Sequence, residues 1–140
     1  MINISHIIKE YGYDTKDGWK NGIESILMDF SIIFSKVLDG SGYYAYRNPT
    51  IGEKNINISK IGVVGSTKDD RIIWIYPKMK FKNVDLGINR DLFDRISRTI
   101  ILPEPKEVKP GKCQTEWVIR IDLSTALKVC AVFANKEYSE

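Results

Sequence analysis

A run of β-branched and aromatic residues in the middle of the chain limits most strongly what fold it can adopt. From Arg71 to Tyr76 the sequence reads RIIWIY, and residues of these types favour a β-strand. Side chains alternate between the two faces of a strand, so Trp74 and Tyr76 share one face. Ile73 and Ile75 then point to the other. A strand that is apolar on both faces is typical of the interior of a sheet that helices cover.

The residues after this strand predict a β-hairpin. Pro77 has no backbone N–H to give to a sheet, so we expect the first strand to end there and the chain to turn through Lys80. A second strand is predicted from Phe81 to Leu86. Its polar and basic residues indicate that it is the weaker and more exposed of the two. We therefore place the functional part of the hairpin mainly at the turn and in the second strand.

Three other segments have strand character. Tyr43 to Arg47 predicts a short strand closed by Asn48-Pro49, and residues 55–64 predict a strand that ends at Gly65. The short connections from there to the hairpin favour an antiparallel meander. Residues 116–121 alternate between apolar and mixed positions and predict a further strand.

The longest helical period in the chain runs from Trp19 to Val37, where apolar residues recur at spacings of three and four. Asp17 is a suitable N-cap, and residues 39–42, Asp-Gly-Ser-Gly, tolerate the positive φ with which helices end. A helix with such a wide apolar face has to cover a large surface, and the sheet provides it.

Three shorter helical segments and one loop complete the chain. The helices are predicted from His6 to Tyr11 with Ser5 as the cap, over about ten residues after Asn89 or Asp91, and from Asp122 or Ser124 to Tyr138. The proline-rich segment 103–114 is predicted to be a surface loop. We expect an α+β fold in a single domain over residues 1–140, with residues 1–18 forming a short N-terminal helix and a loop. The sheet is mainly antiparallel with about five strands, two longer helices pack on one face, and there is one short helix.

The composition is that of a folded domain, with 43% hydrophobic and 28% charged residues among 140. No apolar run approaches the roughly 20 residues that span a bilayer, and the first residues lack the features of a secretory signal. We therefore expect a cytoplasmic protein. The only cysteines are Cys113 and Cys130, and His6 is the only histidine, so we expect neither a disulfide framework nor a metal or other cofactor. Cys130 is expected in the core.

The positive charge is concentrated in one part of the chain. Residues 1–40 have a net charge of −2, residues 41–82 of +5 and residues 83–140 of zero. The hairpin contributes basic residues close to aromatic ones, an arrangement that could contact phosphates and stacked bases. Lysines at a hairpin turn can also serve only to prevent aggregation of sheet edges, and the sequence leaves both interpretations open.

Three catalytic motifs are not fulfilled by the sequence. Gly62 to Lys68 has the wrong glycine spacing for a phosphate-binding loop and reads better as a strand. Glu104-Pro105-Lys106, with Asp85 upstream, has the spacing of a metal-dependent nuclease, but its prolines indicate a loop. No nucleophile elbow of the type Gly-x-Ser-x-Gly occurs. We therefore expect no catalytic residues.

Two blocks of the chain resemble a known family. They are IIWIYPKMKFKNVDLGI, which contains Tyr76-Pro77-Lys78, and EWVIRIDLSTALKVCAVFANKEY, which ends with Glu137-Tyr138. Together they resemble a small α+β domain of unknown function found at the C-terminus of bacterial and archaeal proteins, some labelled predicted transport proteins. The resemblance runs from Arg71 to Tyr138 and implies the fold. The family has no assigned activity that it could imply.

These observations favour a non-catalytic binding domain whose partner, nucleic acid or an acidic protein, docks on the basic meander. The candidate partner-binding residues are Arg71, Trp74, Tyr76, Lys78, Lys80, Phe81 and Lys82. An alternative is an inhibitor or immunity protein that blocks a toxin or an enzyme. An unrecognised hydrolase is the third and least favoured hypothesis.

Overall fold

The computed structural model describes residues 1–10, 23–51, 57–65, 73–77, 83–108 and 116–140. In chain order its elements are β1 (Ile2–Asn3), α1 (Ile4–Glu10), α2 (Ile23–Leu38), β2 (Tyr43–Ile51), β3 (Asn57–Gly65), β4 (Ile73–Pro77), β5 (Asn83–Ile88), α3 (Arg90–Ser97), β6 (Lys106–Val108), β7 (Glu116–Asp122), α4 (Leu123–Phe133) and β8 (Tyr138–Ser139). The predicted α+β class is confirmed. The counts were wrong, because the described elements include a six-stranded sheet, a second small sheet and four helices.

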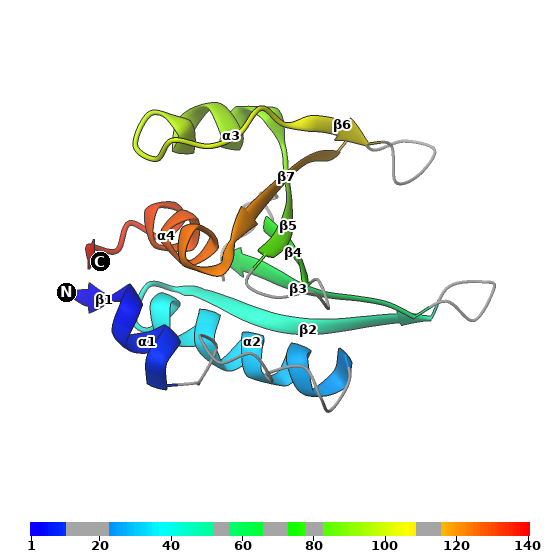
Figure 1. Cartoon of the computed structure of the whole chain (residues 1–140), viewed down its shortest axis with the longest axis horizontal. Helices are drawn as coiled ribbons and strands as arrows, with labels where there is room; N and C mark the ends of the chain where they lie inside the picture. The colour runs from blue at the N-terminus through cyan, green and yellow to red at the C-terminus, as the bar shows by residue number, and fades with distance from the viewer. Residues whose placement is uncertain (11–22, 52–56, 66–72, 78–82, 109–115) are drawn as a thin grey trace.

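The main sheet has the strand order β2-β3-β4-β5-β7-β6, and all its neighbouring strands are antiparallel. The strands β2 to β5 follow one another along the chain and in space, so the predicted meander is confirmed. Figure 1 shows these strands as a strongly curved layer, with α1 and α4 near the two termini and α2 running alongside β2.

One face of this sheet is packed against the helices. In β4 the side chains of Ile73 and Ile75 are fully buried, whereas the alternate residues Trp74 and Tyr76 are half-buried. The register places the buried apolar side chains of β3, β5 and β7 on the same face as these isoleucines. Every described helix contributes buried residues to the same hydrophobic cluster. We call the face towards the helices the inner face and the opposite one the open face.

Cap residues fix where the helices begin. The Asn89 side chain accepts a hydrogen bond from the backbone N–H of Leu92, and Asp122 accepts one from Thr125. Of the two alternatives predicted for each helix, the caps are therefore Asn89 and Asp122. The cap of α1 was predicted wrongly. The helix begins before Ser5, and the Asn3 side chain accepts the hydrogen bond from the N–H of His6 instead.

The second strand of the hairpin is not the weak, exposed strand that the sequence predicts. Strand β5 lies between β4 and β7, and its residues from Val84 to Ile88 are all buried. Among them Asp85 lies opposite Arg120 of β7. The buried carboxylate of this strand therefore has its partner across the sheet, which the sequence pattern alone does not reveal.

The two proline-containing breaks were also predicted wrongly. Strand β2 continues through Asn48-Pro49 to Ile51, where the backbone stays paired with β3. This is possible because β2 is an edge strand, so the missing N–H of a proline costs no ladder hydrogen bond if it faces away from the sheet. In the predicted loop 103–114, residues Lys106–Val108 form the short edge strand β6.

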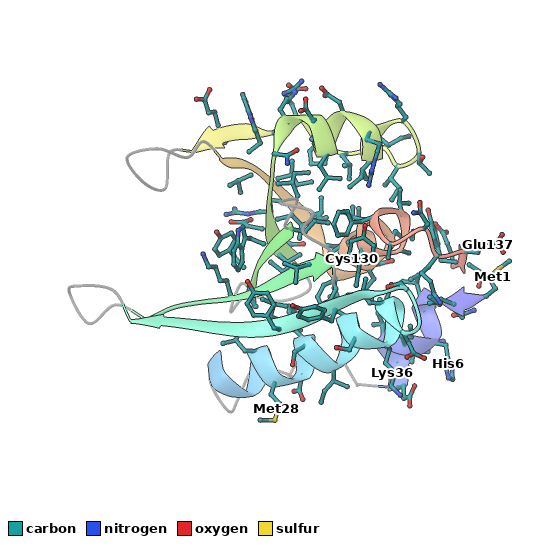
Figure 2. All side chains as sticks on the ribbon, turned by 180° about the vertical axis from the view of Figure 1, so that it is seen from behind. Met1, His6, Met28, Lys36, Cys130 and Glu137 are labelled. Carbon is teal, nitrogen blue, oxygen red and sulfur yellow. The ribbon has the colours of Figure 1, made fainter. Side chains whose placement is uncertain are left out.

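The C-terminal helix is shorter than predicted. It ends at Phe133, and Asn135 adopts the left-handed conformation with a φ of 56°. The following residues form β8, which pairs in parallel with β1 and so joins the two ends of the described chain. Figure 2 shows Met1 and Glu137 near each other at this end, and the Ile2 N–H donates to the Glu137 carbonyl. The figure also shows Cys130 in the interior, where its predicted core position is confirmed.

Helix α2 ends as the sequence predicts, because Gly40 and Gly42 both have positive φ angles directly after it. The predicted start near Trp19 and the Asp17 cap lie outside the described residues. In the part of the chain that the structure describes, no helix has the length and hydropathy needed to cross a membrane.

The cap of α4 gives a test of this fold. Replacing Asp122 by alanine leaves the Thr125 N–H without its acceptor and should lower the free energy of unfolding by about 1 kcal/mol. Urea denaturation followed by circular dichroism measures this. The matched control is Ser124→Ala, within the first turn of the helix, which should change stability by less than about 0.5 kcal/mol. Equal losses in the two variants would show that Asp122 is not the cap.

Candidate functional site

The open face of the sheet carries four aromatic side chains, and we call them the aromatic cluster. They are Tyr44 and Tyr46 of β2 and Trp74 and Tyr76 of β4. The register places them on the same face, because Tyr46 pairs with Gly62 and Gly62 pairs with Trp74. Tyr44 is exposed, and the other three are half-buried. Rings gathered on a face away from the core suggest a contact surface.

Gly62 allows the cluster to form across strand β3. A Cβ atom at this position would lie 2.7 Å from Cε1 and Cζ of Tyr46, so the tyrosine ring lies directly over the glycine. The ring thereby reaches Trp74 on the next strand, with 6.1 Å between the ring centroids and an edge-to-face angle of 75°. Burial, and to a lesser extent the neighbouring Tyr44, raises the pKa of Tyr46. Its phenol is therefore neutral at physiological pH.

A lysine from β3 lies over these rings. The Nζ atom of Lys60 is 3.9 Å from the centroid of the Trp74 ring and 5.9 Å from that of Tyr76. Such a cation–π contact is worth about 0.5 to 1 kcal/mol at an exposed site and more when it is desolvated. The positive charge is thus held at the surface of the aromatic cluster.

Arg120 supplies a second positive charge on the open face. Its Nε donates to Oδ1 of Asp85 over 3.0 Å, and its terminal nitrogen lies 3.5 Å from Oδ2. The hydrogen bond to Asp85, and then the negative charge of that carboxylate, raise the pKa of Arg120. The Asp85 side chain is 12% exposed whereas that of Arg120 is 67% exposed. The carboxylate therefore orients the guanidinium and leaves much of it accessible to a ligand.

Among the residues that the structure describes, basic and acidic ones both lie on this face by register. By register, Lys106 of β6 lies opposite Val118 and so shares the face with Lys60 and Arg120. Two of the acidic residues have partners on the protein, since Asp85 holds Arg120 and Asp122 caps α4. By register Glu116, opposite Val108 at the start of β7, belongs to the same face. Among the described side chains of this face, the basic groups are therefore better placed than the acidic ones to meet an anionic ligand.

The structure places only part of the predicted site. Trp74 and Tyr76 lie on the open face, as the alternation in the sequence indicates. The other predicted residues lie outside the described part of the chain; they are Arg71, Lys78, Lys80, Phe81 and Lys82. The two described residues come from the first strand of the hairpin, so that strand serves the core with one face and the candidate site with the other.

Sequence reasoning missed Tyr44, Tyr46, Lys60 and Arg120. The alternation of Tyr44 and Tyr46 was visible in the sequence, and it indicates that both lie on one face of a strand. The strand order was not visible. Arg120 is 35 residues from Asp85 in the sequence, and only the pairing of β5 with β7 brings them together.

The catalytic patterns set aside on sequence grounds find no support in the described geometry. Gly62 and Gly65 lie within β3, as predicted. Asp85 binds Arg120, whereas Glu104 lies 3.6 Å from Arg90, so the two acids do not face a common metal. No cluster of potential metal ligands occurs among the residues that the structure describes. Burial raises the pKa of the Cys130 thiol, which is the property of a core residue rather than of a nucleophile.

Comparison of the chain with models of protein families, with curated proteins and with solved structures found no match. The resemblance to a C-terminal domain of bacterial and archaeal proteins stays a prediction.

The contact between Gly62 and Tyr46 can be tested by a double-mutant cycle. Gly62→Ala puts a methyl group where the Tyr46 ring lies, so the ring has to move away from Trp74. Gly62→Ala should therefore lower the free energy of unfolding by at least about 1 kcal/mol more in the wild-type protein than in a Tyr46→Ala background, where the ring is absent. Urea denaturation of the four proteins measures this difference. An identical effect in both backgrounds would place the Tyr46 ring elsewhere.

Proposed function

We propose that this protein is a non-catalytic binding domain that docks nucleic acid on the open face of its sheet. The observation that carries the proposal is the Lys60 ammonium held against Trp74 and Tyr76 on a face opposite to the helices. Basic groups bind the phosphates of a nucleic acid, and aromatic rings bind its bases. This face offers both within one small area.

The distribution of charge supports the same partner. Residues 41–82, which include β2, β3 and β4, carry the whole positive excess of the chain. Lys106 lies on the edge strand β6, and Lys60 lies on β3, one strand in from the other edge. An anionic ligand that crosses the strands would meet positive charge along its path.

Removal of two basic residues from the open face should weaken this binding. Replacing both Lys60 and Arg120 by glutamine removes two positive charges, while the amide of the Arg120→Gln side chain can still donate a hydrogen bond to Asp85. We expect the slope of log K against log salt concentration to fall by about 0.7 to 0.9 for each phosphate that the variant no longer neutralises. Fluorescence anisotropy with labelled oligonucleotides of mixed sequence, both single- and double-stranded, measures it.

The matched control changes two basic residues on the helices by the same substitution. Lys36 lies in the last turn of α2 and Arg95 in the last turn of α3, and both are exposed. Figure 2 shows Lys36 on the helical side of the molecule. The Lys36→Gln/Arg95→Gln variant should bind like the wild type. Absence of salt-sensitive binding by the wild type to either oligonucleotide rejects a nucleic-acid partner. Equally tight binding of poly-glutamate would indicate an acidic protein instead.

A further inference from the structure

We infer that the ligand of the open face is single-stranded nucleic acid, with a base stacked on Trp74 and a neighbouring phosphate bound by Lys60. This inference rests on the proposed function, and it adds the strandedness of the ligand and the roles of two residues. It follows from the arrangement of side chains in two rows that run across the strands.

The first row is aromatic. Tyr46, Gly62, Trp74 and Gly87 are successive partners across β2, β3, β4 and β5. Each ring in this row has a glycine as its cross-strand neighbour, so no side chain stands between Tyr46 and Trp74. Because its neighbours on both sides are glycines, the face of the Trp74 ring over which Lys60 lies offers apolar surface on which a base can stack.

The second row is polar and lies two residues further along β4, at Tyr76 instead of Trp74. Tyr76, Asp85 and Arg120 are successive partners across β4, β5 and β7. Lys60, which precedes Ile61 on β3, continues this row beside Tyr76, since Ile61 pairs with Ile75. Lys60 and Arg120 are three strand spacings apart, about 14 Å at roughly 4.8 Å per spacing. The two cations can therefore contact different phosphates of one strand that crosses the sheet.

The width of the sheet favours a single strand over a duplex. The major groove of a DNA duplex is about 12 Å wide and admits a helix or a two-stranded ribbon. Six strands span about 24 Å, counted as five spacings of roughly 4.8 Å, so this face cannot enter a groove. The bases of a duplex are also stacked on one another and present no free ring face to Trp74. A single strand can turn its bases onto the sheet.

Lys60 and the base compete for the same surface of Trp74. In the free protein the ammonium lies over the ring at 3.9 Å, where a stacked base would have to lie. Lysine has a long and flexible side chain, so its ammonium can move aside while it stays near the ring. A phosphate of the incoming nucleotide then replaces the Trp74 ring as the partner of the Lys60 ammonium. Lys60 thus binds the phosphate backbone of the ligand, and Trp74 binds its base.

The decisive experiment compares three labelled probes of equal length at low salt by anisotropy. They are an oligothymidylate, a duplex, and an oligonucleotide in which abasic sites replace the bases but the phosphates remain. The wild-type protein should bind the oligothymidylate most tightly. A stacked base is worth about 1 to 3 kcal/mol, so Trp74→Ala should weaken this binding roughly 5- to 150-fold. The same substitution should not change binding of the abasic probe.

Two controls separate stacking from damage to the fold. Trp74→Phe keeps a ring and should recover most of the affinity. Trp117→Phe changes an indole on the inner face, since Trp117 pairs with the buried Ile88, and should not alter binding. In a variant that keeps Trp74 as its only tryptophan, the oligothymidylate should quench the fluorescence and the abasic probe should not.

Lys60→Ala separates phosphate binding by Lys60 from base stacking on Trp74. For all probes it should lower the slope of log K against log salt concentration, by about 0.7 for a single strand. The affinity for the oligothymidylate, divided by that for the abasic probe, should stay at least as large as in the wild type. If the duplex and the abasic probe bind as tightly as the oligothymidylate, base stacking is rejected while nucleic-acid binding stands. If none of the probes binds, the proposed function itself is rejected.

Discussion

The burial of one face of the central strands is the interaction on which the rest of the structure depends. Ile73 and Ile75 of β4 and Leu86 of β5 are fully buried on the inner face. Burial of such a side chain stabilises the fold by about 1.5 to 3 kcal/mol. Because successive side chains of a strand point to opposite faces, this burial also determines which residues face away from the helices. The position of Trp74 and Tyr76 on the open face is therefore a consequence of the core.

The open face is shaped by two further constraints. A tyrosine ring can lie over β3 only because residue 62 has no side chain, and this brings Tyr46 to Trp74. A carboxylate as buried as that of Asp85 needs a charged partner, and the cross-strand residue Arg120 provides it. The same contact holds a guanidinium at the surface. Structural requirements of the sheet thus place aromatic and basic groups side by side. In the proposed function these groups bind the bases and the phosphates of nucleic acid.

Local signals in the sequence predicted the elements well where a short-range physical cause decides them. The alternation of side chains predicted β4 and β7. Side chains that can accept a hydrogen bond from the first turn predicted the starts of α3 and α4, at Asn89 and Asp122. Two of the failures have a common cause. Whether Pro49 ends a strand, and whether β5 is exposed, depends on which strand lies alongside, and β2 proved to be an edge while β5 proved to be central. The sequence contains no local signal for that order.

The sequence by itself determined the α+β class, the meander and the face of β4 that carries Trp74 and Tyr76, because periodicity and caps act over a few residues. Only the tertiary structure decided which other residues join them. Lys60 and Tyr46 reach Trp74 through the registers of two strand pairs, and Arg120 reaches Asp85 from a strand 35 residues away in sequence. Register and strand order are set by packing of the whole inner face against the helices. A site built across strands is therefore fixed only when the sheet is complete.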